Sequence, residues 1–402
     1  MTTVTVVEAA ETSPGRGRLA TFTAQQRQIG PTTRPISGSP GSVDHRLATG
    51  RYQSPLRYPG AKSGLATVIG KLVESAMGSA QLQRVDLLVE PFAGGAATSL
   101  RLVGAGIVDR VLLADADPLV AMFWQVAAAE TEELIDRMTD EYDRYVSHGG
   151  VVALERWDFW RGWTPPAGMS ADTARREAAM KCLFLNRTTF SGILHGQAGP
   201  IGGRRQESPY GIGCRFNVGG LTERLRYVGH LYQTHRLVDV WCKDWKETLG
   251  DVPEWYPQLI PNRVVAYLDP PYLEKSGKLY QQSFEVTAAS IAEGAYASWS
   301  SGRAHRRLAE YVRRQIQFRW ILSYDAHPTL LSDKAFYSNS RMNPCDRDRI
   351  EFGTKCWPIS KRLVSLNYTA SARNGRGAAN ELLLTTLPSR CVPVDDLFKP
   401  VI

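Results

Sequence analysis

Apolar residues recur along the chain at two different periods, and together they predict alternating helices and strands. Just after Pro59-Gly60, apolar side chains fall at helical spacing, at Leu65, Val68, Ile69, Leu72 and Val73. Strands are predicted at residues 85–90 and 110–115, with a short helix at 96–103 between them and another helix that begins at Pro118. This order of strand, loop, helix and strand is half of a doubly wound, nucleotide-binding sheet.

The alternation of strands and helices resumes later in the chain, after a long interruption. Residues 131 to about 185 show helical patterns, whereas residues 192–220 are rich in glycine and predict a loop-dominated segment. Strands are predicted at 264–268, 318–323 and 381–387, with a helix at 305–315. We therefore expect an α/β fold, a Rossmann-like doubly wound sheet with an inserted segment that is mostly helical and loop-rich.

Both ends of the chain lack this periodicity. Residues 1–52 are rich in Thr, Ser, Gly, Pro and Ala, and they predict a disordered N-terminal tail. Residues 391–402 are predicted to form a C-terminal tail. The remaining residues divide into a first catalytic part at 53–129, an insert at 130–235 and a second catalytic part at 236–390.

Composition narrows the class of protein. The chain has 402 residues, of which 43% are hydrophobic and 22% charged, which is ordinary for a globular protein. No apolar run approaches the roughly 20 residues needed to cross a bilayer, and no secretory signal is present. The six cysteines show no metal-ligand spacing, so we expect no metal. The net charge of +8 favours a polyanionic partner such as nucleic acid.

The tetrapeptide Asp269-Pro270-Pro271-Tyr272 directly follows an apolar strand. In open parallel sheets, ligands bind at the carboxyl ends of strands, so Asp269 lies where chemistry is expected. An exocyclic amine on a nucleobase becomes nucleophilic when its hydrogens are drawn toward acceptors. Asp269 and the Pro270 carbonyl supply two such acceptors, and Tyr272 offers a flat face for an extruded base. A Pro-Pro turn with a packed tyrosine is the alternative interpretation.

A second candidate site is the loop after the first strand, Glu90 to Ala96, which lacks the dinucleotide pattern G-x-G-x-x-G. Its glycines allow close approach of an amino-acid or ribose group, which Phe92 can cover. Asp115 ends the next strand and is placed to accept two ribose hydroxyls. Asp117 competes for that role, or it caps the helix at Pro118. Upstream, Lys62 stands in a turn, where it can pair with a carboxylate of the ligand or the site.

Six motifs occur in a fixed order along the chain: RYPGAKS, VEPFAGG, LADADP, NRTTFSG, CKDW and LDPPY. In this order, over residues 54–387, the chain resembles the Dam-like alpha group of S-adenosylmethionine-dependent DNA adenine methyltransferases. The resemblance implies that Asp269, Pro270, Pro271 and Tyr272 hold the target base and that S-adenosylmethionine is the cofactor. The implied cofactor-binding residues are Tyr58, Gly60, Lys62, Glu90, Pro91, Phe92, Gly94, Asp115, Asp244 and Trp245.

Asp269 follows Glu90 by 179 positions, which is more than the rest of the sheet needs. By the resemblance, the surplus at 130–235 is a target-recognition region. Its DNA-facing residues are expected to be Asn186, Arg187, Thr188, Arg204, Arg205 and Arg215. Solvated loop charge remains an equal alternative for Arg204 and Arg205. A later cluster, with Arg303, Arg306, Arg307, Arg313 and Arg314, is interpreted as a solvated helix face.

We expect the chain to methylate the exocyclic N6 of adenine in double-stranded DNA, as a cytoplasmic monomer that joins the nucleoid when bound to DNA. A cognate restriction or defence nuclease is a candidate partner. Two alternatives remain at this stage: a cytosine-N4 methyltransferase using the same tetrapeptide, and a nucleic-acid-binding protein without activity. The turn Pro59-Gly60-Ala61-Lys62 and the segment after Tyr272 differ in sequence from those of the GATC-modifying enzymes. The recognition sequence of those enzymes is therefore not carried over to this chain.

Overall fold

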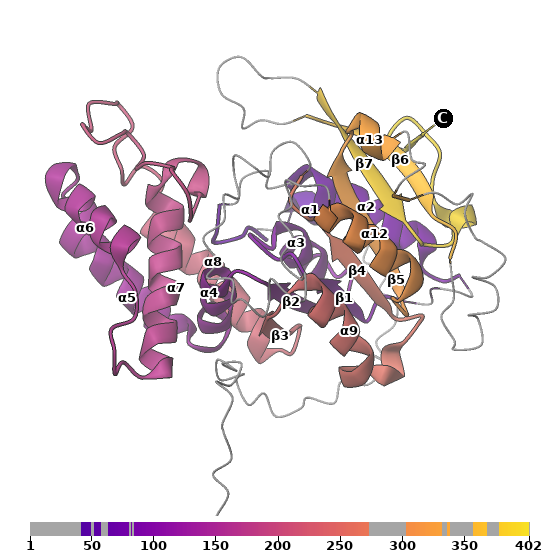
Figure 1. Cartoon of the computed structure of the whole chain (residues 1–402), viewed down its shortest axis with the longest axis horizontal. Coiled ribbons are helices and arrows are strands. Elements are labelled where there is room, and N and C mark those ends of the chain that lie inside the picture. The colour runs from indigo at the N-terminus through magenta and orange to yellow at the C-terminus, as the bar shows by residue number, and fades with distance from the viewer. Residues whose placement is uncertain are drawn as a thin grey trace, which may run out of the picture.

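The computed structural model describes residues 42–49, 52–57, 63–79, 82, 84–272, 303–331, 336–337, 357–367 and 378–401 (Figure 1). Its α-helices are α1 (Val43–Thr49), α2 (Ser63–Ala76), α3 (Ala97–Gly104), α4 (Pro118–Ala129), α5 (Thr131–Glu141), α6 (Gly150–Gly162), α7 (Ala171–Thr188), α8 (Val218–Gln233), α9 (Trp245–Trp255), α12 (Arg303–Arg314) and α13 (Pro328–Leu331). Short turns of helix lie at η1 (Tyr142–Val146), η2 (Phe190–Gly192), η3 (Pro257–Leu259) and η6 (Ser389–Cys391). The strands are β1 (Leu87–Glu90), β2 (Val111–Asp115), β3 (Leu237–Cys242), β4 (Val264–Leu268), β5 (Arg319–Asp325), β6 (Ser360–Asn367), β7 (Ala378–Thr385) and β8 (Lys399–Pro400).

These strands form one sheet in the order β3-β2-β1-β4-β5-β7-β6-β8. The strands from β3 to β5 are parallel, whereas β7 pairs antiparallel with β5 and β6, and β8 pairs antiparallel with β6. The chain moves outward from β1 to β3 and then returns to the other side of β1 with β4. The strand order therefore reverses between β1 and β4, and ligands bind at such a reversal in open α/β sheets.

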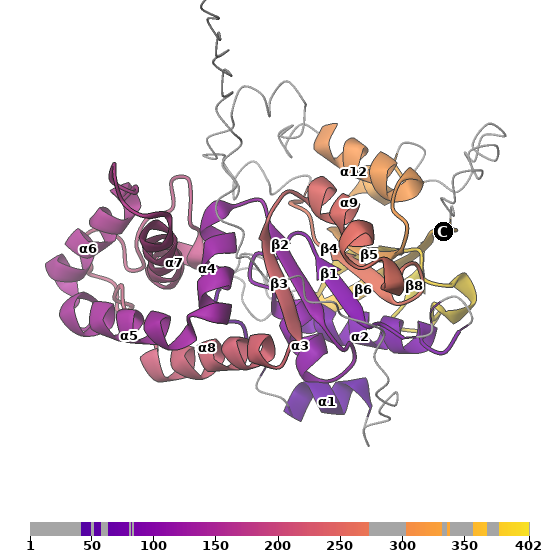
Figure 2. The same ribbon diagram turned by 90° about the horizontal axis from the view of Figure 1, so that it is seen from below.

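Helices cover both faces of the sheet, as the expected doubly wound fold requires. Figure 2 shows α1, α2 and α3 on one side of the strands and α9 and α12 on the other. Successive strand residues point to opposite faces, so Leu88 belongs to the core under α2 and α3 while Leu87 and Val89 belong to the core under α9 and α12. The four residues of β1 are all buried, as in a central parallel strand.

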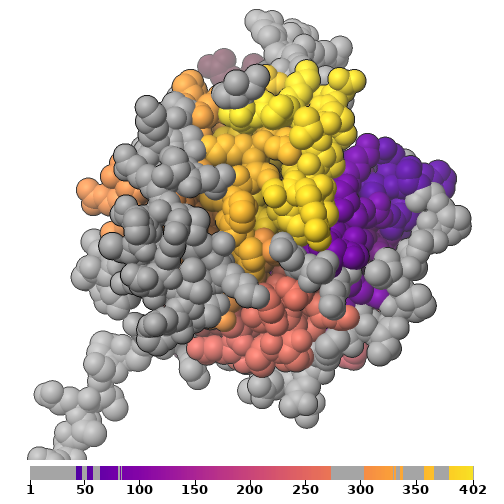
Figure 3. Space-filling view, turned by 90° about the vertical axis from the view of Figure 1, so that its right-hand side faces the viewer, coloured from indigo at the N-terminus to yellow at the C-terminus, as the bar shows by residue number. Residues whose placement is uncertain are grey.

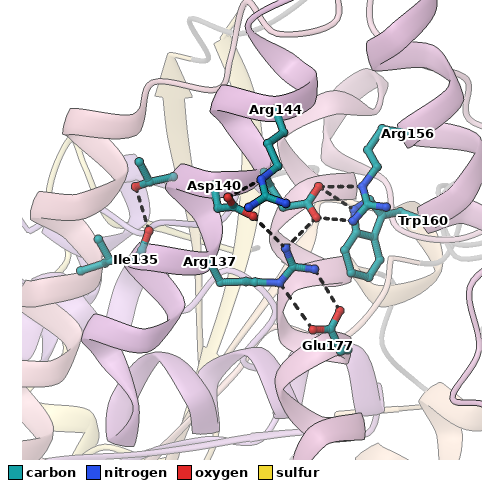
Figure 4. Close-up of polar contacts among 9 residues, drawn as sticks. Ile135, Arg137, Asp140, Arg144, Arg156, Trp160 and Glu177 are labelled. Atoms are coloured by element: carbon teal, nitrogen blue, oxygen red, sulfur yellow. Dashed lines mark hydrogen bonds and ion pairs between the residues drawn. The ribbon is translucent and has the colours of Figure 1, made fainter.

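Residues 130–235, which follow α4 and precede β3 in the chain, form a helical unit beside the sheet. Figure 1 shows α5, α6 and α7 at the end of the molecule away from the β5–β8 edge. A buried carboxylate ties these helices together: Glu141 is fully buried and bonds Arg156 from α6, with Nε to Oε2 at 2.8 Å. Arg137 Nη1 lies 3.0 Å from Glu141 Oε1, and the Trp160 indole donates to Oε2 at 3.2 Å (Figure 4). Because Arg137 also pairs with Glu177 of α7, the network spans three helices.

The predicted boundary of the N-terminal tail, at residue 52, is wrong, because some of the residues before it belong to the fold. Residues 1–41 lie outside the described residues, but Val43–Thr49 form α1, in which Val43 and Leu47 are buried against the core under α2. The prediction failed because two apolar residues on a seven-residue helix give too weak a periodic signal.

The predicted C-terminal tail is also wrong. Val392 and Phe398 are buried, and Lys399–Pro400 pair with β6. Figure 3 shows this C-terminal segment, in yellow, directly beside the indigo N-terminal helices, in agreement with the contacts of α2 with β6 and η6. Only Lys399 and Pro400 of this segment form a strand, and two residues are too few to show the hydrophobic periodicity of a strand in the sequence. Within the described residues, no helix is both long and apolar enough to cross a membrane.

Candidate active site

Three carboxylates end neighbouring strands at the point where the strand order reverses. Glu90 ends β1, Asp115 ends β2, and Asp269 follows β4 directly. Burial raises the pKa of Glu90 to about 8, and the negative charges of Asp269 and Asp115 raise it further. Only 4% of Glu90 is exposed, and its Oε2 atom has no hydrogen-bond partner among the described residues. At neutral pH this site therefore holds a neutral Glu90.

The loop between β1 and α3 is fixed by backbone contacts rather than by its side chains. Gly94 N donates to Asp115 Oδ2 at 2.8 Å, and Trp124 Nε1 of α4 donates to the Gly94 carbonyl at 2.9 Å. Gly94 has a positive φ of 44°, which glycine adopts without strain. Pro91 is buried, and Phe92 is half-buried against the core under α9. The loop thus holds its backbone close to Asp115.

Asp115 and Asp117 have different partners, which separates their roles. Asp115 Oδ1 accepts from the Asp117 amide at 2.8 Å, and burial followed by the charge of Asp117 raises the Asp115 pKa to about 7. Asp117 is the N-cap of α4, where its Oδ1 accepts from Leu119 N at 2.9 Å. Its Oδ2 lies 2.6 Å from His195 Nε2 of the insert. The capping interpretation of Asp117 is therefore correct. Sequence reasoning did not identify His195.

Asp244 and Trp245 begin α9. Asp244 is the N-cap, with Oδ1 accepting from Lys246 N at 2.7 Å and from Glu247 N at 2.8 Å. Burial raises the pKa of Asp244. Trp245 packs edge-on against Tyr311 of α12, with ring centroids 5.4 Å apart. Both residues lie after β3, at the same edge of the sheet as Asp115, which pairs with Cys242.

Asp269 and Tyr272 are held by residues that sequence reasoning did not identify. Ser323 Oγ of β5 donates to Asp269 Oδ1 at 3.0 Å, and the Tyr267 hydroxyl lies 3.1 Å from Ser323 Oγ. The Tyr272 hydroxyl donates to Glu381 Oε2 of β7 at 3.0 Å and lies 3.5 Å from Asp269 Oδ1. Pro270 is buried, whereas Pro271 and Tyr272 are half-buried. The alternative interpretation, a Pro-Pro turn with a packed tyrosine, does not explain the bond from Tyr272 to the Glu381 carboxylate. Nor does it explain why Asp269 lies near Glu90.

Three residues predicted to face DNA are buried instead. Asn186, Arg187 and Thr188 are 0%, 5% and 0% exposed at the end of α7. Asn186 Oδ1 accepts from Arg57 N at 2.7 Å and its Nδ2 donates to Arg57 O at 2.5 Å, while Arg187 bonds the Pro55 carbonyl. Burial lowers the pKa of Arg187 to about 9. A direct DNA contact by these three side chains is wrong for this structure, because they bind the protein backbone.

The other three predicted DNA-facing residues are exposed. Arg204 pairs with Asp158 of α6 through contacts of 3.0 and 2.6 Å, so its charge is balanced. Arg205 and Arg215 have no such pair among the described residues. Burial lowers the pKa of Arg57, and nearby Arg215 lowers it further. Two cations side by side favour an anion at this place.

The predicted cofactor residues Tyr58, Gly60 and Lys62 lie outside the described residues. The helix that follows them, α2, occurs where the apolar spacing predicted it. Among the residues that the structure describes, no cluster of three His, Cys, Asp or Glu side chains is arranged to hold a metal ion.

Comparison with known proteins adds a family to this geometry. No curated protein sequence matches the chain. The model of the D12 class N6 adenine-specific DNA methyltransferases matches residues 58–197, which include the loop at Glu90, Asp115 and the NRTTFSG segment. The match stops before Asp269. The sheet, with its strand reversal between β1 and β4, agrees with a methyltransferase fold. Over residues 58–197, the chain is similar to the D12 class of N6 adenine-specific DNA methyltransferases.

Proposed function

We propose that the chain transfers a methyl group from S-adenosylmethionine to adenine N6 in double-stranded DNA, with the reaction at the carboxyl ends of β1, β2 and β4. The observation that carries this assignment is the convergence of Glu90, Asp115 and Asp269 where the strand order reverses. Carboxylates at this place suit both halves of the task, because a cationic cofactor and an exocyclic amine each need hydrogen-bond acceptors.

The described residues fit the cofactor. Each oxygen of Asp115 accepts one backbone N–H, which leaves lone pairs to accept from the two ribose hydroxyls. The unpartnered Oε2 of Glu90 is a buried polar atom that a donor group of the cofactor satisfies. When bound, S-adenosylmethionine supplies an electrophilic methyl group on a sulfonium. The remaining proposed contacts are Tyr58, Gly60, Lys62, Pro91, Phe92, Gly94, Asp244 and Trp245.

The tetrapeptide prepares the adenine amine. Asp269 and the Pro270 carbonyl accept its two hydrogens, and Tyr272 stacks on the base after extrusion from the duplex, which costs a few kcal/mol. Ser323 and Glu381 limit the rotation of Asp269 and Tyr272 through the contacts described above. Held in this geometry, the amine needs no strong base, because it loses a proton only after it has become cationic. Positioning supplies most of the rate.

We assign target recognition to the helical unit at 130–235, with Arg205 and Arg215 as its DNA contacts. The exposure of these two arginines, the absence of an ion pair with a described carboxylate and the closeness of Arg215 to Arg57 support this assignment. We further propose that the enzyme acts as a cytoplasmic monomer on duplex DNA, and that a cognate restriction or defence nuclease shares its recognition sequence.

Methylation of plasmid DNA by the purified protein, followed by mass analysis of the nucleosides, tests the function. We expect N6-methyladenine from the wild type and none from Asp269→Ala, while S-adenosylmethionine still binds that variant in a calorimetric titration. Glu155→Ala, a change at an exposed carboxylate on α6, serves as the control and retains activity. Methylcytosine as the product, or turnover by Asp269→Ala, contradicts the proposal.

A further inference from the structure

The first two turns of α12 carry an exposed arginine cluster, Arg303, Arg306 and Arg307. The exposed positions of the helix include 303, 307, 310 and 314, which follow the spacing of a single helical face. None of the three arginines makes an ion pair or hydrogen bond with another residue in the described part of the chain. From the sequence, these arginines, together with Arg313 and Arg314, are interpreted as a solvated helix face.

Two contacts fix the direction of α12 on the sheet. His305 Nδ1 lies 2.8 Å from the hydroxyl of Tyr324, which is near the carboxyl end of β5. At the other end, Trp320 Nε1 near the start of β5 donates to the Val312 carbonyl at 2.9 Å. The helix therefore runs antiparallel to β5, on the face that it shares with α9 (Figure 2). Its arginine cluster lies near the carboxyl ends of the parallel strands, where Asp269 follows β4. Arg314 lies near the opposite ends of these strands.

The cluster is close to Tyr272, on which the extruded base is proposed to stack. The ring of Tyr324 lies 6.3 Å from that of Tyr272, and His305, which bonds Tyr324, directly precedes Arg306 and Arg307 in the chain. Tyr324 and His305 thus connect Tyr272 to the start of α12, where the cluster lies. A base that stacks on Tyr272 brings its own backbone phosphates to the rim of this site, because the sugar links them.

Electrostatics requires cations at this rim. Asp115, Asp269 and Glu381 line or support the site, and their negative charges repel the DNA backbone. Several exposed arginines of the helical insert are balanced by acids: Arg204 by Asp158, Arg226 by Glu132 and Arg176 by Glu130. The three arginines of the α12 cluster form no ion pair among the described residues, so their charge remains available to phosphates.

We propose that Arg303, Arg306 and Arg307 bind the DNA backbone phosphates that flank the extruded adenine. This inference rests on the proposed site at Asp269–Tyr272. It assigns the catalytic half of the molecule a DNA contact of its own, separate from Arg205 and Arg215 of the insert. Contacts of this kind position the duplex and carry no base specificity.

The salt dependence of DNA binding tests the proposal, because each phosphate contact releases counterions and steepens the dependence of log K on log salt by about 0.9. We compare Arg307→Gln with Arg314→Gln, which remove the same charge from the same face of α12, about 10 Å apart along the helix axis. The probe is a mixed-sequence duplex of about 30 base pairs, since phosphate contacts do not need the recognition sequence.

We expect Arg307→Gln to make the slope shallower by about one unit, and the variant with all three cluster arginines changed to Gln by about three units. Arg314→Gln keeps the wild-type slope. Equal changes in Arg307→Gln and Arg314→Gln indicate a general effect of net charge and overturn the proposal, as does an unchanged slope in the triple variant. Wild-type protein that binds DNA without methylating it refutes the proposed function instead, so the two failures are distinguishable.

Discussion

Asn186 binds both backbone groups of Arg57. The Arg57 amide donates to Asn186 Oδ1 at 2.7 Å, and Asn186 Nδ2 donates to the Arg57 carbonyl at 2.5 Å. The same Nδ2 donates to the Gly192 carbonyl at 3.1 Å. A Cβ on Gly192 would lie 2.5 Å from the Arg57 carbonyl, so the glycine allows this close approach. The insert therefore holds the residue that directly precedes the proposed cofactor residues Tyr58, Gly60 and Lys62.

Asn186→Leu is expected to weaken binding of S-adenosylmethionine about tenfold, because it removes buried hydrogen bonds worth about 1 kcal/mol each and frees the chain before Tyr58. Calorimetry measures this affinity, and filter binding measures the affinity for DNA, which we expect to stay within twofold. Gln233→Leu, at an exposed amide on α8, is the control. Weakened DNA binding with unchanged cofactor affinity would return Asn186 to a direct DNA role.

The contrast between Asn186 and Asp269 shows how far the sequence predicts this site. The end of β4 was predicted to the residue, because the run Val264–Leu268 is uniformly apolar and Pro270 then ends the ladder. Asp115 and Asp269 were likewise each predicted at the carboxyl end of a strand, where ligands bind in open parallel sheets. Local pattern is enough where a strand end decides the position of a side chain.

Contacts between distant segments could not be predicted in this way. Ser323 reaches Asp269 from 54 residues away, and Glu381 reaches Tyr272 from 109 residues away, so their pairing depends on the strand order β4-β5-β7. Asn186 and Arg187 are polar, and polar side chains usually face solvent. Their burial became apparent only from the backbone groups of Pro55 and Arg57 that they bind.

Tyr272 and Glu381 are expected to act as a pair in catalysis. Tyr272→Phe keeps the stacking ring but loses the 3.0 Å bond to Glu381, and Glu381→Gln weakens that bond by removing the charge. Each change should lower kcat about tenfold while the KM for S-adenosylmethionine stays unchanged, since both residues are proposed to act on the target base. The double variant should cost little more than either single change, because both remove the same contact. Additive losses would show that the two residues act independently.

Asp115 and Asp117 should respond differently to the same change. Asp115→Asn is expected to weaken cofactor binding at least tenfold. The Asn side chain accepts hydrogen bonds less well than a carboxylate, both from the backbone N–H groups of Gly94 and Asp117 and from the two ribose hydroxyls. Asp117→Asn retains most of the cap of α4, since Asn is a good N-cap residue. Isothermal titration of both variants decides the assignment. Equal losses of affinity, or a larger loss in Asp117→Asn, would move the ribose contact to Asp117.

Glu141 is expected to control the stability of the helical insert. Glu141→Gln leaves Arg156 partly buried without its carboxylate, and loss of one partner of a buried pair costs about 3 to 5 kcal/mol. The exposed pair of Arg144 and Asp140 provides the comparison, because Arg144→Ala should cost less than 1 kcal/mol. Urea unfolding followed by tryptophan fluorescence measures both, since Trp160 lies in the Glu141 network. Equal effects in the two variants would mean that burial of Glu141 adds nothing.

The raised pKa of Glu90 makes stability depend on pH. Glu90 has a pKa of about 8 in the folded protein and an ordinary value of 4.5 when exposed, so between these values the folded state holds a proton that the unfolded chain has released. The free energy of unfolding contributed by this group therefore falls as the pH rises from 4.5 to about 8 and changes little above it. Glu90→Gln carries no titrating proton and should flatten the curve over this range, as measured by urea unfolding at half-unit intervals without cofactor. Glu155→Gln, at an exposed carboxylate, should leave the curve unchanged. An identical pH slope in Glu90→Gln and the wild type would mean that Glu90 ionises normally, and the neutral acid beside Asp269 would then have to be abandoned.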